Sequence, residues 1–222
     1  MSQHLFTKLL RRMKVRKARA IALSLLMGLG LVGLGLMLGR PPVSQAATTL
    51  TVNSIADDGT GTCTASNCTL RDAISSAVSG DTINFSLPAN SAITLTNGEL
   101  VINKNLIISG PGANLLTVQR SASAGNFRIF RIFPNTKASI SALTIANGNV
   151  SGNISGGGIG NFGTLTITNS TISGNSASTT SFFGGGIYVD SDMVTITDST
   201  ILKSVVRFPG NGSVNVTDSH GS

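Results

Sequence analysis

Two glycine triplets, each followed by the same pattern of strand-forming residues, constrain the fold more than any other feature of this sequence. Gly156–Gly158 precede the segment Thr164–Ile172, and Gly184–Gly186 precede Met193–Ile201. The copies are offset by 28 residues at the glycines (184 − 156) and by 29 at the strand-forming segments (193 − 164). Repetition at this period is typical of a solenoid, in which each repeat forms one coil that stacks on its neighbours.

Isoleucines five residues apart indicate the shape of each coil. Side chains alternate between the two faces of a strand, so two inward residues at an odd separation require a corner between them. Asn169 and Asp198 occupy this corner in the two repeats, and both residue types favour turns. We expect their side chains to form a ladder at the corner of adjacent coils, as stacked asparagines do. The pairs are Ile102 and Ile107, Ile140 and Ile145, Ile167 and Ile172, and Ile196 and Ile201. The sequence therefore predicts an all-β fold, a parallel β-helix.

The net charge of +7 over 222 residues does not describe the repeats. Eight of the 16 Lys and Arg residues, and none of the 9 Asp and Glu residues, lie before position 47, which leaves eight basic and nine acidic residues in the remainder. A nucleic-acid-binding face needs an excess of basic residues to neutralise phosphates. The remainder has no such excess, so nucleic acid is excluded as a partner.

The basic N-terminal segment is followed by an apolar stretch and a small-residue run. Ile21–Gly39 is apolar except for Ser24, and Ser44–Ala47 supplies a small-x-small pattern. Together these features are typical of a secretory signal peptide, with cleavage predicted after Ala46. The alternative is an uncleaved membrane anchor, since the apolar stretch has the length to span a bilayer. We therefore expect an exported protein, extracellular or on the cell surface, that meets the membrane only through residues 1–46.

Cys63 and Cys68 are the only cysteines, and in an exported chain they are candidates for a disulfide. A zinc site would need further ligands, and His4 and His220 lie far away in the sequence. Asp57–Gly61 is expected to be a turn; a calcium loop is the alternative, but too few spaced acidic residues follow. No metal or other cofactor is expected.

The segment from Thr69 to Gly80 is predicted to be a helix. Thr69 can cap the amide three residues on, Asp72 suits the first turn, and Gly80 is a good helix stop. Apolar residues at helical spacing form one face: Leu70, Ala73, Ile74, Ala77 and Val78. Because a solenoid needs its open apolar end covered, we expect this helix to cap the first coil.

The same segment carries a resemblance to a known family. Cys68–Ile74 reads Cys-Thr-Leu-Arg-Asp-Ala-Ile and resembles the CSLREA domain, named for Cys-Ser-Leu-Arg-Glu-Ala; Thr69 and Asp72 are conservative departures. The glycine triplets and Asn169–Asn175 resemble repeats of surface proteins related to polymorphic outer membrane proteins. The resemblance implies export and a right-handed parallel β-helix. It makes Thr69, Leu70, Arg71, Asp72, Ala73 and Ile74 a structural motif of an N-terminal cap, residues 47–80, that precedes the repeats at 81–202.

The repeat rhythm stops after Leu202. Residues 203–222 contain no further glycine triplet and are predicted to form an irregular tail. We expect the chain to be a truncated copy of a longer protein.

No convincing catalytic constellation is present. Asp190 and Asp192 are the only close acidic pair within the repeats, and their place in a variable loop favours a solvated turn. Arg71 and Asp72 are expected to be structural around the cap helix. The predicted function is that of a non-catalytic, adhesion-like scaffold on the surface or in the medium, whose partners are cell-surface glycans or proteins of a host or neighbouring surface. The alternative is a carbohydrate-active β-helix enzyme, a lyase or hydrolase, that lacks its catalytic coils.

Overall fold

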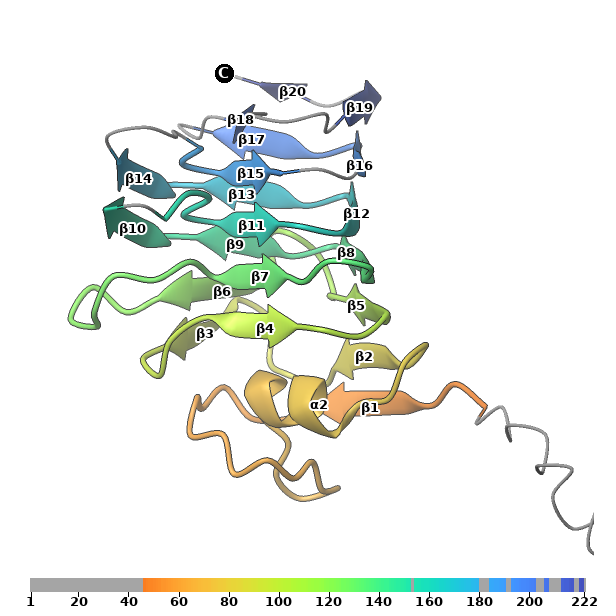
Figure 1. Cartoon of the computed structure of the whole chain (residues 1–222). Coiled ribbons are helices and arrows are strands. Elements are labelled where there is room, and N and C mark those ends of the chain that lie inside the picture. The colour runs from red at the N-terminus through yellow and green to blue at the C-terminus, as the bar shows by residue number, and fades with distance from the viewer. Residues whose placement is uncertain are drawn as a thin grey trace, which may run out of the picture. The chain divides into compact units, whose positions relative to one another are not determined.

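The strands of this chain stack in parallel to form a β-solenoid, with the short helix α2 at its start (Figure 1). The computed structural model describes residues 46–152, 154–179, 184–190, 193–202, 206–207, 213–217 and 220–221. The predicted signal peptide, apart from its last residue, and Asp192 lie outside these ranges. None of the described residues forms a helix with the length and apolarity that a membrane span requires.

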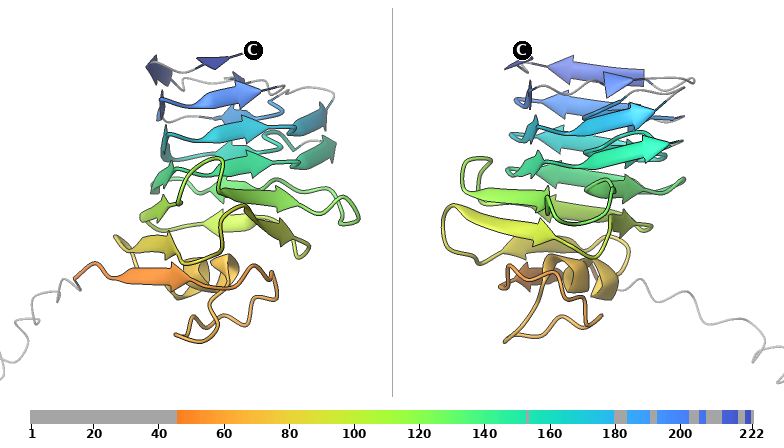
Figure 2. Two further views of the ribbon diagram at one scale, coloured as in Figure 1. Left: turned by 180° about the vertical axis from the view of Figure 1, so that it is seen from behind. Right: turned by 90° about the vertical axis from the view of Figure 1, so that its left-hand side faces the viewer.

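Successive coils contribute strands to three parallel sheets, which wrap the core (Figures 1 and 2). The first sheet consists of β1 (Thr49–Val52), β2 (Thr82–Phe85), β5 (Leu106–Ser109), β8 (Lys137–Ser141), β12 (Thr164–Thr168), β16 (Met193–Thr197) and β19 (Ser213–Thr217). The second consists of β3 (Ser91–Leu95), β6 (Leu116–Arg120), β9 (Thr144–Ala146), β13 (Thr171–Ser173), β17 (Thr200–Leu202) and β20 (His220–Gly221). The third consists of β4 (Leu100–Ile102), β7 (Phe130–Ile132), β11 (Ile159–Asn161), β15 (Ile187–Val189) and β18 (Val206–Arg207). A separate pair, β10 (Asn149–Gly152) and β14 (Ser176–Thr179), extends two coils sideways.

Inward side chains form continuous apolar rows from coil to coil. In β12, Leu165 and Ile167 are fully buried, while the threonines on either side of them face outward. Ile167 pairs in register with Ile140 of β8 and Ile196 of β16, so branched side chains of one shape stack along the solenoid. This row confirms the parallel stacking predicted from the repeat.

The predicted corner lies between the first and second sheets. Ile167 of β12 and Ile172 of β13 are both buried, although they are five positions apart, an odd offset. Asn169 turns the chain with φ of 50°, and Asp198 repeats the turn with φ of 48°. Ala142 does the same with φ of 54° in the coil before. All three residues stand in the left-handed region, which the short polar side chains of Asn169 and Asp198 tolerate better than most.

Hydrogen bonds between coils at this corner come from the backbone and from a serine. The amide of Asn169 donates to the Thr197 carbonyl at 3.1 Å, and the amide of Ser170 donates to Ser199 Oγ at 3.2 Å. Ser170 and Ser199 are buried, whereas the side chains of Asn169 and Asp198 are exposed. The corner positions therefore stack as expected, and a side-chain ladder between them stays a prediction.

The prediction for one isoleucine pair is wrong. Ile102 is buried in β4, but Ile107 is 45% exposed, and its neighbours Leu106 and Ile108 point inward instead. Ile108 pairs with Ile140, and the residue paired with Ile145 in this coil is Val118. This pair spans the corner between the third and first sheets, from β4 to β5, whereas the other pairs span the corner between the first and second sheets, so the five-residue spacing does not apply.

The chain after Leu202 also differs from the predicted irregular tail. Within its described residues, β18, β19 and β20 pair with β15, β16 and β17 and extend all three sheets. Val216 pairs with Ile196 at an offset of only 20 residues, because this coil has no glycine triplet and a shorter connection. The shorter period hides the repeat from a search at 28 or 29 residues.

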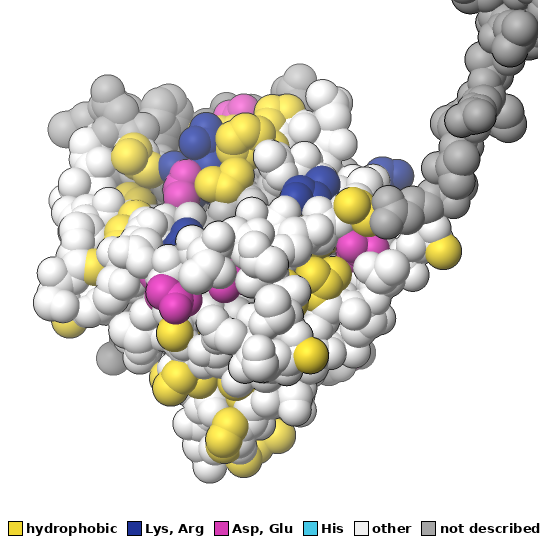
Figure 3. All heavy atoms as spheres, turned by 90° about the horizontal axis from the view of Figure 1, so that it is seen from below, with side chains coloured by type: hydrophobic (Ala, Val, Ile, Leu, Met, Phe, Trp, Pro, Cys, Tyr) yellow, Lys and Arg dark blue, Asp and Glu magenta, His cyan; other side chains and the backbone are white. Residues whose placement is uncertain are grey.

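Helix α2 (Leu70–Ser76) covers the start of the solenoid, as predicted. Thr69 is its N-cap, with Oγ1 accepting from the amide of Asp72 at 3.1 Å. The helix ends at Ser76, four residues before the predicted stop at Gly80. At this end of the helix, Lys104 Nζ donates to the carbonyls of Ile74 and Ala77 at 3.1 and 2.9 Å. Leu70, Ala73 and Ile74 are buried in the core. Seen from this end, the surface shows scattered hydrophobic groups among polar atoms (Figure 3).

The left-handed corner generates a testable difference between two substitutions of Asn169. Valine is strained at positive φ, whereas glycine adopts this conformation freely. We expect Asn169→Val to lower the free energy of unfolding by about 1–2 kcal/mol more than Asn169→Gly. Urea unfolding of both variants measures this difference. Equal destabilisation by the two substitutions would contradict the assigned role of Asn169, which is to adopt positive φ at the corner.

Candidate functional site

The predicted motif residues lie together at the capped end, where Arg71 connects three segments. Arg71 Nε donates to Asp57 Oδ1 at 2.7 Å, and Nη2 and Nη1 donate to the carbonyls of Gly98 and Glu99 at 2.8 and 3.2 Å. Asp57 Oδ2 accepts from the amides of Thr96 and Asn97 at 2.7 and 2.9 Å. Both Asp57 oxygens thus bind protein donors, which argues against the calcium-loop alternative. The described residues hold no group of three or more His, Cys, Asp or Glu positioned for a metal.

Asp72 is buried and does not pair with Arg71. Its Oδ1 accepts from the Gly61 amide at 2.6 Å, and its Oδ2 accepts from Thr69 Oγ1 at 2.7 Å. Burial alone would raise the pKa of Asp72, but these hydrogen bonds, with a further one from Thr60, hold it below its ordinary value. Arg71 and Asp72 therefore both join the loop before the helix to the helix itself, through different partners.

A disulfide closes the same loop. Cys63 and Cys68 are bonded, as predicted, with their Cα atoms 4.3 Å apart. Asn53, just after β1, fastens this loop from the other side: its Nδ2 donates to the Ala65 carbonyl and its Oδ1 accepts from the Cys68 amide, both at 2.8 Å. The capping residues are therefore engaged in holding the cap, which points to a ligand site elsewhere.

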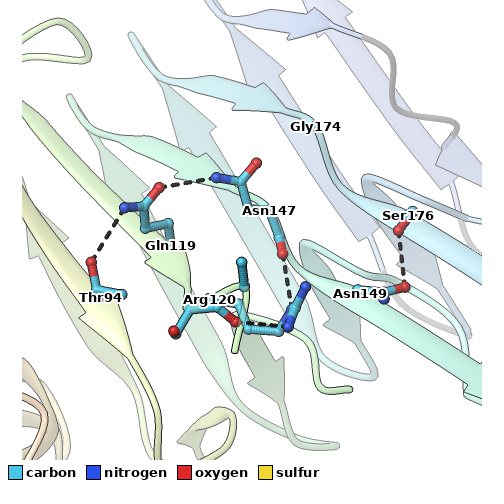
Figure 4. Close-up of a pocket in the computed structure, with 9 residues that line it drawn as sticks. Thr94, Gln119, Arg120, Asn147, Asn149, Gly174 and Ser176 are labelled. Atoms are coloured by element: carbon cyan, nitrogen blue, oxygen red, sulfur yellow. Dashed lines mark hydrogen bonds between the residues drawn. The ribbon is translucent and has the colours of Figure 1, made fainter. Parts of the chain in front are cut away.

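A polar groove of about 490 Å³ lies over the outer face of the second sheet (Figure 4). Successive coils supply its floor: Gln119 of β6 donates from Nε2 to Thr94 Oγ1 at 3.2 Å and accepts at Oε1 from Asn147 Nδ2 at 3.0 Å. The pair β10 and β14 borders the groove, with Ser176 Oγ donating to Asn149 Oδ1 at 3.0 Å. The amide–hydroxyl chain therefore runs across the coils.

Arg120 is the only charged residue among those lining the groove. It is fixed by the protein, since Nε donates to the Asn147 carbonyl at 3.1 Å and Nη1 to the Ser121 carbonyl at 2.8 Å. The lining contains no carboxylate, the group that glycoside hydrolysis normally requires in pairs. The chemistry that these residues offer is hydrogen bonding to a neutral, hydroxyl-rich ligand.

Sequence reasoning missed this groove. Asn147 and Gly174 follow equivalent strands, β9 and β13, and both turn the chain with positive φ, 60° and 62°. The strings Asn147-Gly148-Asn149 and Gly174-Asn175-Ser176 could have marked this second corner. Gln119 and Thr94 gave no signal, because their neighbourhood depends on the register of β3 against β6.

A second polar cluster lies on the third sheet, and its charged groups bind to one another. Gly160 of β11 stands between Arg131 and Tyr188 in one cross-strand row, and a side chain at Gly160 would overlap the Arg128 guanidinium. Arg128 is 7% exposed, and its Nε lies 2.9 Å from Glu99 Oε2. Burial lowers the pKa of Arg128, and the nearby Glu99 opposes this effect. Asp190, one member of the close acidic pair, accepts from Tyr188 Oη at 3.0 Å.

Comparison with protein-family models, curated proteins and solved structures finds no match to this chain. The function of the groove and of the sheet faces is therefore inferred from their own geometry and chemistry.

The hydrogen bonds of Asp72 predict a stability change in acid. A pKa that folding lowers stabilises the protein at pH values above the unfolded pKa of about 3.9, and this stabilisation is lost as the pH falls through the lower, folded pKa. Asp72→Asn is expected to cost about 1–3 kcal/mol at neutral pH, because the amide has one acceptor oxygen where the carboxylate has two. The same variant should lose less stability than the parent as the pH falls from about 5 to about 2, where the stabilisation from a lowered carboxyl pKa is lost.

Urea unfolding across this pH range measures both effects, and Asp58→Asn, at an exposed position, is the matched control. A parallel pH dependence for parent and Asp72→Asn would contradict the assigned role of Asp72.

Proposed function

We propose that this protein is an exported, non-catalytic β-solenoid that acts as an adhesion-like surface scaffold and binds neutral glycan chains in the groove of the second sheet. In this proposal the coils are right-handed and residues 1–46 direct export. The resemblance of Cys68–Ile74 to the CSLREA domain supports export, and the Cys63–Cys68 disulfide is consistent with an oxidising compartment.

The observation that carries the glycan proposal is the amide–hydroxyl chain from Thr94 through Gln119 to Asn147. At about 4.8 Å per strand, the floor from β3 to β13 extends about 14 Å, which suits a linear ligand more than a compact one. Asn147 is exposed and Gln119 and Thr94 are partly exposed, so their remaining donor and acceptor capacity faces the solvent.

The register across coils also argues for binding by a rigid surface. The strands that carry these groups are paired in the sheet and their positions are fixed before a ligand arrives. Less side-chain and loop ordering then accompanies association, which favours affinity for a hydroxyl-rich chain.

A glycan array and calorimetry on the full chain test this function. We expect binding to a neutral polysaccharide, weakened about fivefold by Gln119→Ala through the loss of hydrogen bonds worth about 1 kcal/mol. Asn114→Ala is the matched control, because Asn114 is exposed and does not line the groove. Release of new reducing ends from a bound polysaccharide would favour the enzyme alternative instead. An absence of binding to every glycan, or equal loss with both variants, would contradict the proposal.

A further inference from the structure

The outer face of the first sheet carries two rows of uncharged, mostly small side chains. Beside them lie Lys137, Thr164 and Met193, two residues before Ser139, Thr166 and Thr195 in their strands. Thr166 of β12 pairs with Thr195 of β16, and Thr168 pairs with Thr197, so two threonines two residues apart repeat in register on adjacent coils. The first row is Thr49, Thr82, Ile107, Ser139, Thr166, Thr195 and Asn215. The second row is Ser109, Ser141, Thr168, Thr197 and Thr217. We name these two rows the hydroxyl face; the exposed Ile107 is the one position in them without a polar side chain.

The spacing of the hydroxyl face is set by the backbone in both directions. Neighbouring parallel strands lie about 4.8 Å apart, and alternate residues of one strand lie about 6.6 Å apart. The strands stack directly on one another along the solenoid (Figure 1). Threonine adds a β-branched side chain with few χ1 rotamers, so its hydroxyl and methyl groups hold their positions. The result is a two-dimensional array of hydroxyl groups that is interrupted at Ile107 and Asn215.

The central hydroxyls of this array are available to solvent. Among the residues that the structure describes, no protein group forms a hydrogen bond with the side chains of Thr166, Thr168, Thr195 or Thr197, all of which are partly exposed. This differs from the groove on the second sheet, where the polar side chains bond to one another. Water is therefore the partner of these four hydroxyls, and its positions must follow their spacing.

The composition of the face selects among extended ligands. Neither row contains a charged residue, and Lys137 beside the first row is the one charge in the described strands of this sheet, so the face offers little to complement a polyelectrolyte. Neither row contains an aromatic ring, the side chain with the largest flat apolar area for a sugar ring to contact. What remains is a neutral lattice of hydroxyl and methyl groups that orders water.

We propose that the hydroxyl face binds ice. Its spacing of about 4.8 Å between coils lies near one repeat of the oxygen lattice of hexagonal ice, and its spacing between the rows is somewhat shorter than the longer repeat, so water molecules bridging its hydroxyls occupy positions from which that lattice can continue. Rigid threonines keep the array in place, and their methyl groups contact the water between the rows. This activity uses a different sheet from the glycan groove and does not rest on the proposed glycan binding.

Ice-affinity partitioning and inhibition of ice recrystallisation, both with the full chain, test this proposal. We expect the parent protein to be enriched in the ice fraction and to keep ice grains small. Thr166→Tyr places a bulky ring in the centre of the face and is expected to reduce both effects to those of a serum albumin control. Thr171→Tyr is the matched control: Thr171 faces outward on β13 in a threonine row of the second sheet and should retain full activity.

Urea midpoints for both variants separate loss of binding from loss of folding. If Thr166→Tyr unfolds more easily than Thr171→Tyr, the test uses Thr195→Lys in place of Thr166→Tyr, since a lysine side chain at this outward position extends into solvent. Failure of the parent protein to enter ice, or equal losses in the face variant and the control, would overturn the proposal. Binding of the face to crystalline cellulose or chitin without binding to ice, or self-association of the parent that Thr166→Tyr abolishes, would also overturn it.

Discussion

The structure depends on a backbone turn that keeps the register between coils. Asn169, Asp198 and Ala142 adopt positive φ at the same corner of successive coils, and each turn brings the next inward isoleucine back toward the core. Because strands in a solenoid contact only their neighbours above and below, an error at one corner would displace every side chain of that coil. The apolar rows, the groove and the hydroxyl face all require that this turn repeats at the same place.

The cap covers the start of the apolar core, which would otherwise be exposed to solvent. Helix α2 covers it with three buried apolar residues, and the connections that hold the helix in place are polar: Arg71 to Asp57, Asp72 to Gly61 and Lys104 to the last carbonyls. A short helix has little stability of its own. The disulfide and these charged hydrogen bonds therefore replace the packing that a neighbouring coil provides elsewhere.

The repeat and the local helix signals made much of the fold predictable. The stacking of Ile140, Ile167 and Ile196 follows from the repeat. The N-cap at Thr69 and the Cys63–Cys68 bond follow from residues close in sequence. The exposed Ile107 did not follow, because Ile102 and Ile107 lie across a different corner of the coil from the other isoleucine pairs. The groove and the hydroxyl face could not be read from single strands, since both are made by the register between strands.

Both surfaces and the core therefore depend on the register between adjacent coils, and paired cysteines test this register most directly. Thr168 and Thr197 face each other on adjacent coils at about 4.8 Å, within the range that a disulfide bridges, whereas Thr168 and Thr195 are offset by about 8 Å. The measurement is the yield of the new cross-link under mild oxidation, by mass spectrometry of peptides. A high yield for Thr168→Cys with Thr197→Cys, and little for Thr168→Cys with Thr195→Cys, is the predicted result. The reverse order of yields would contradict the stacking on which the solenoid and both proposed surfaces depend.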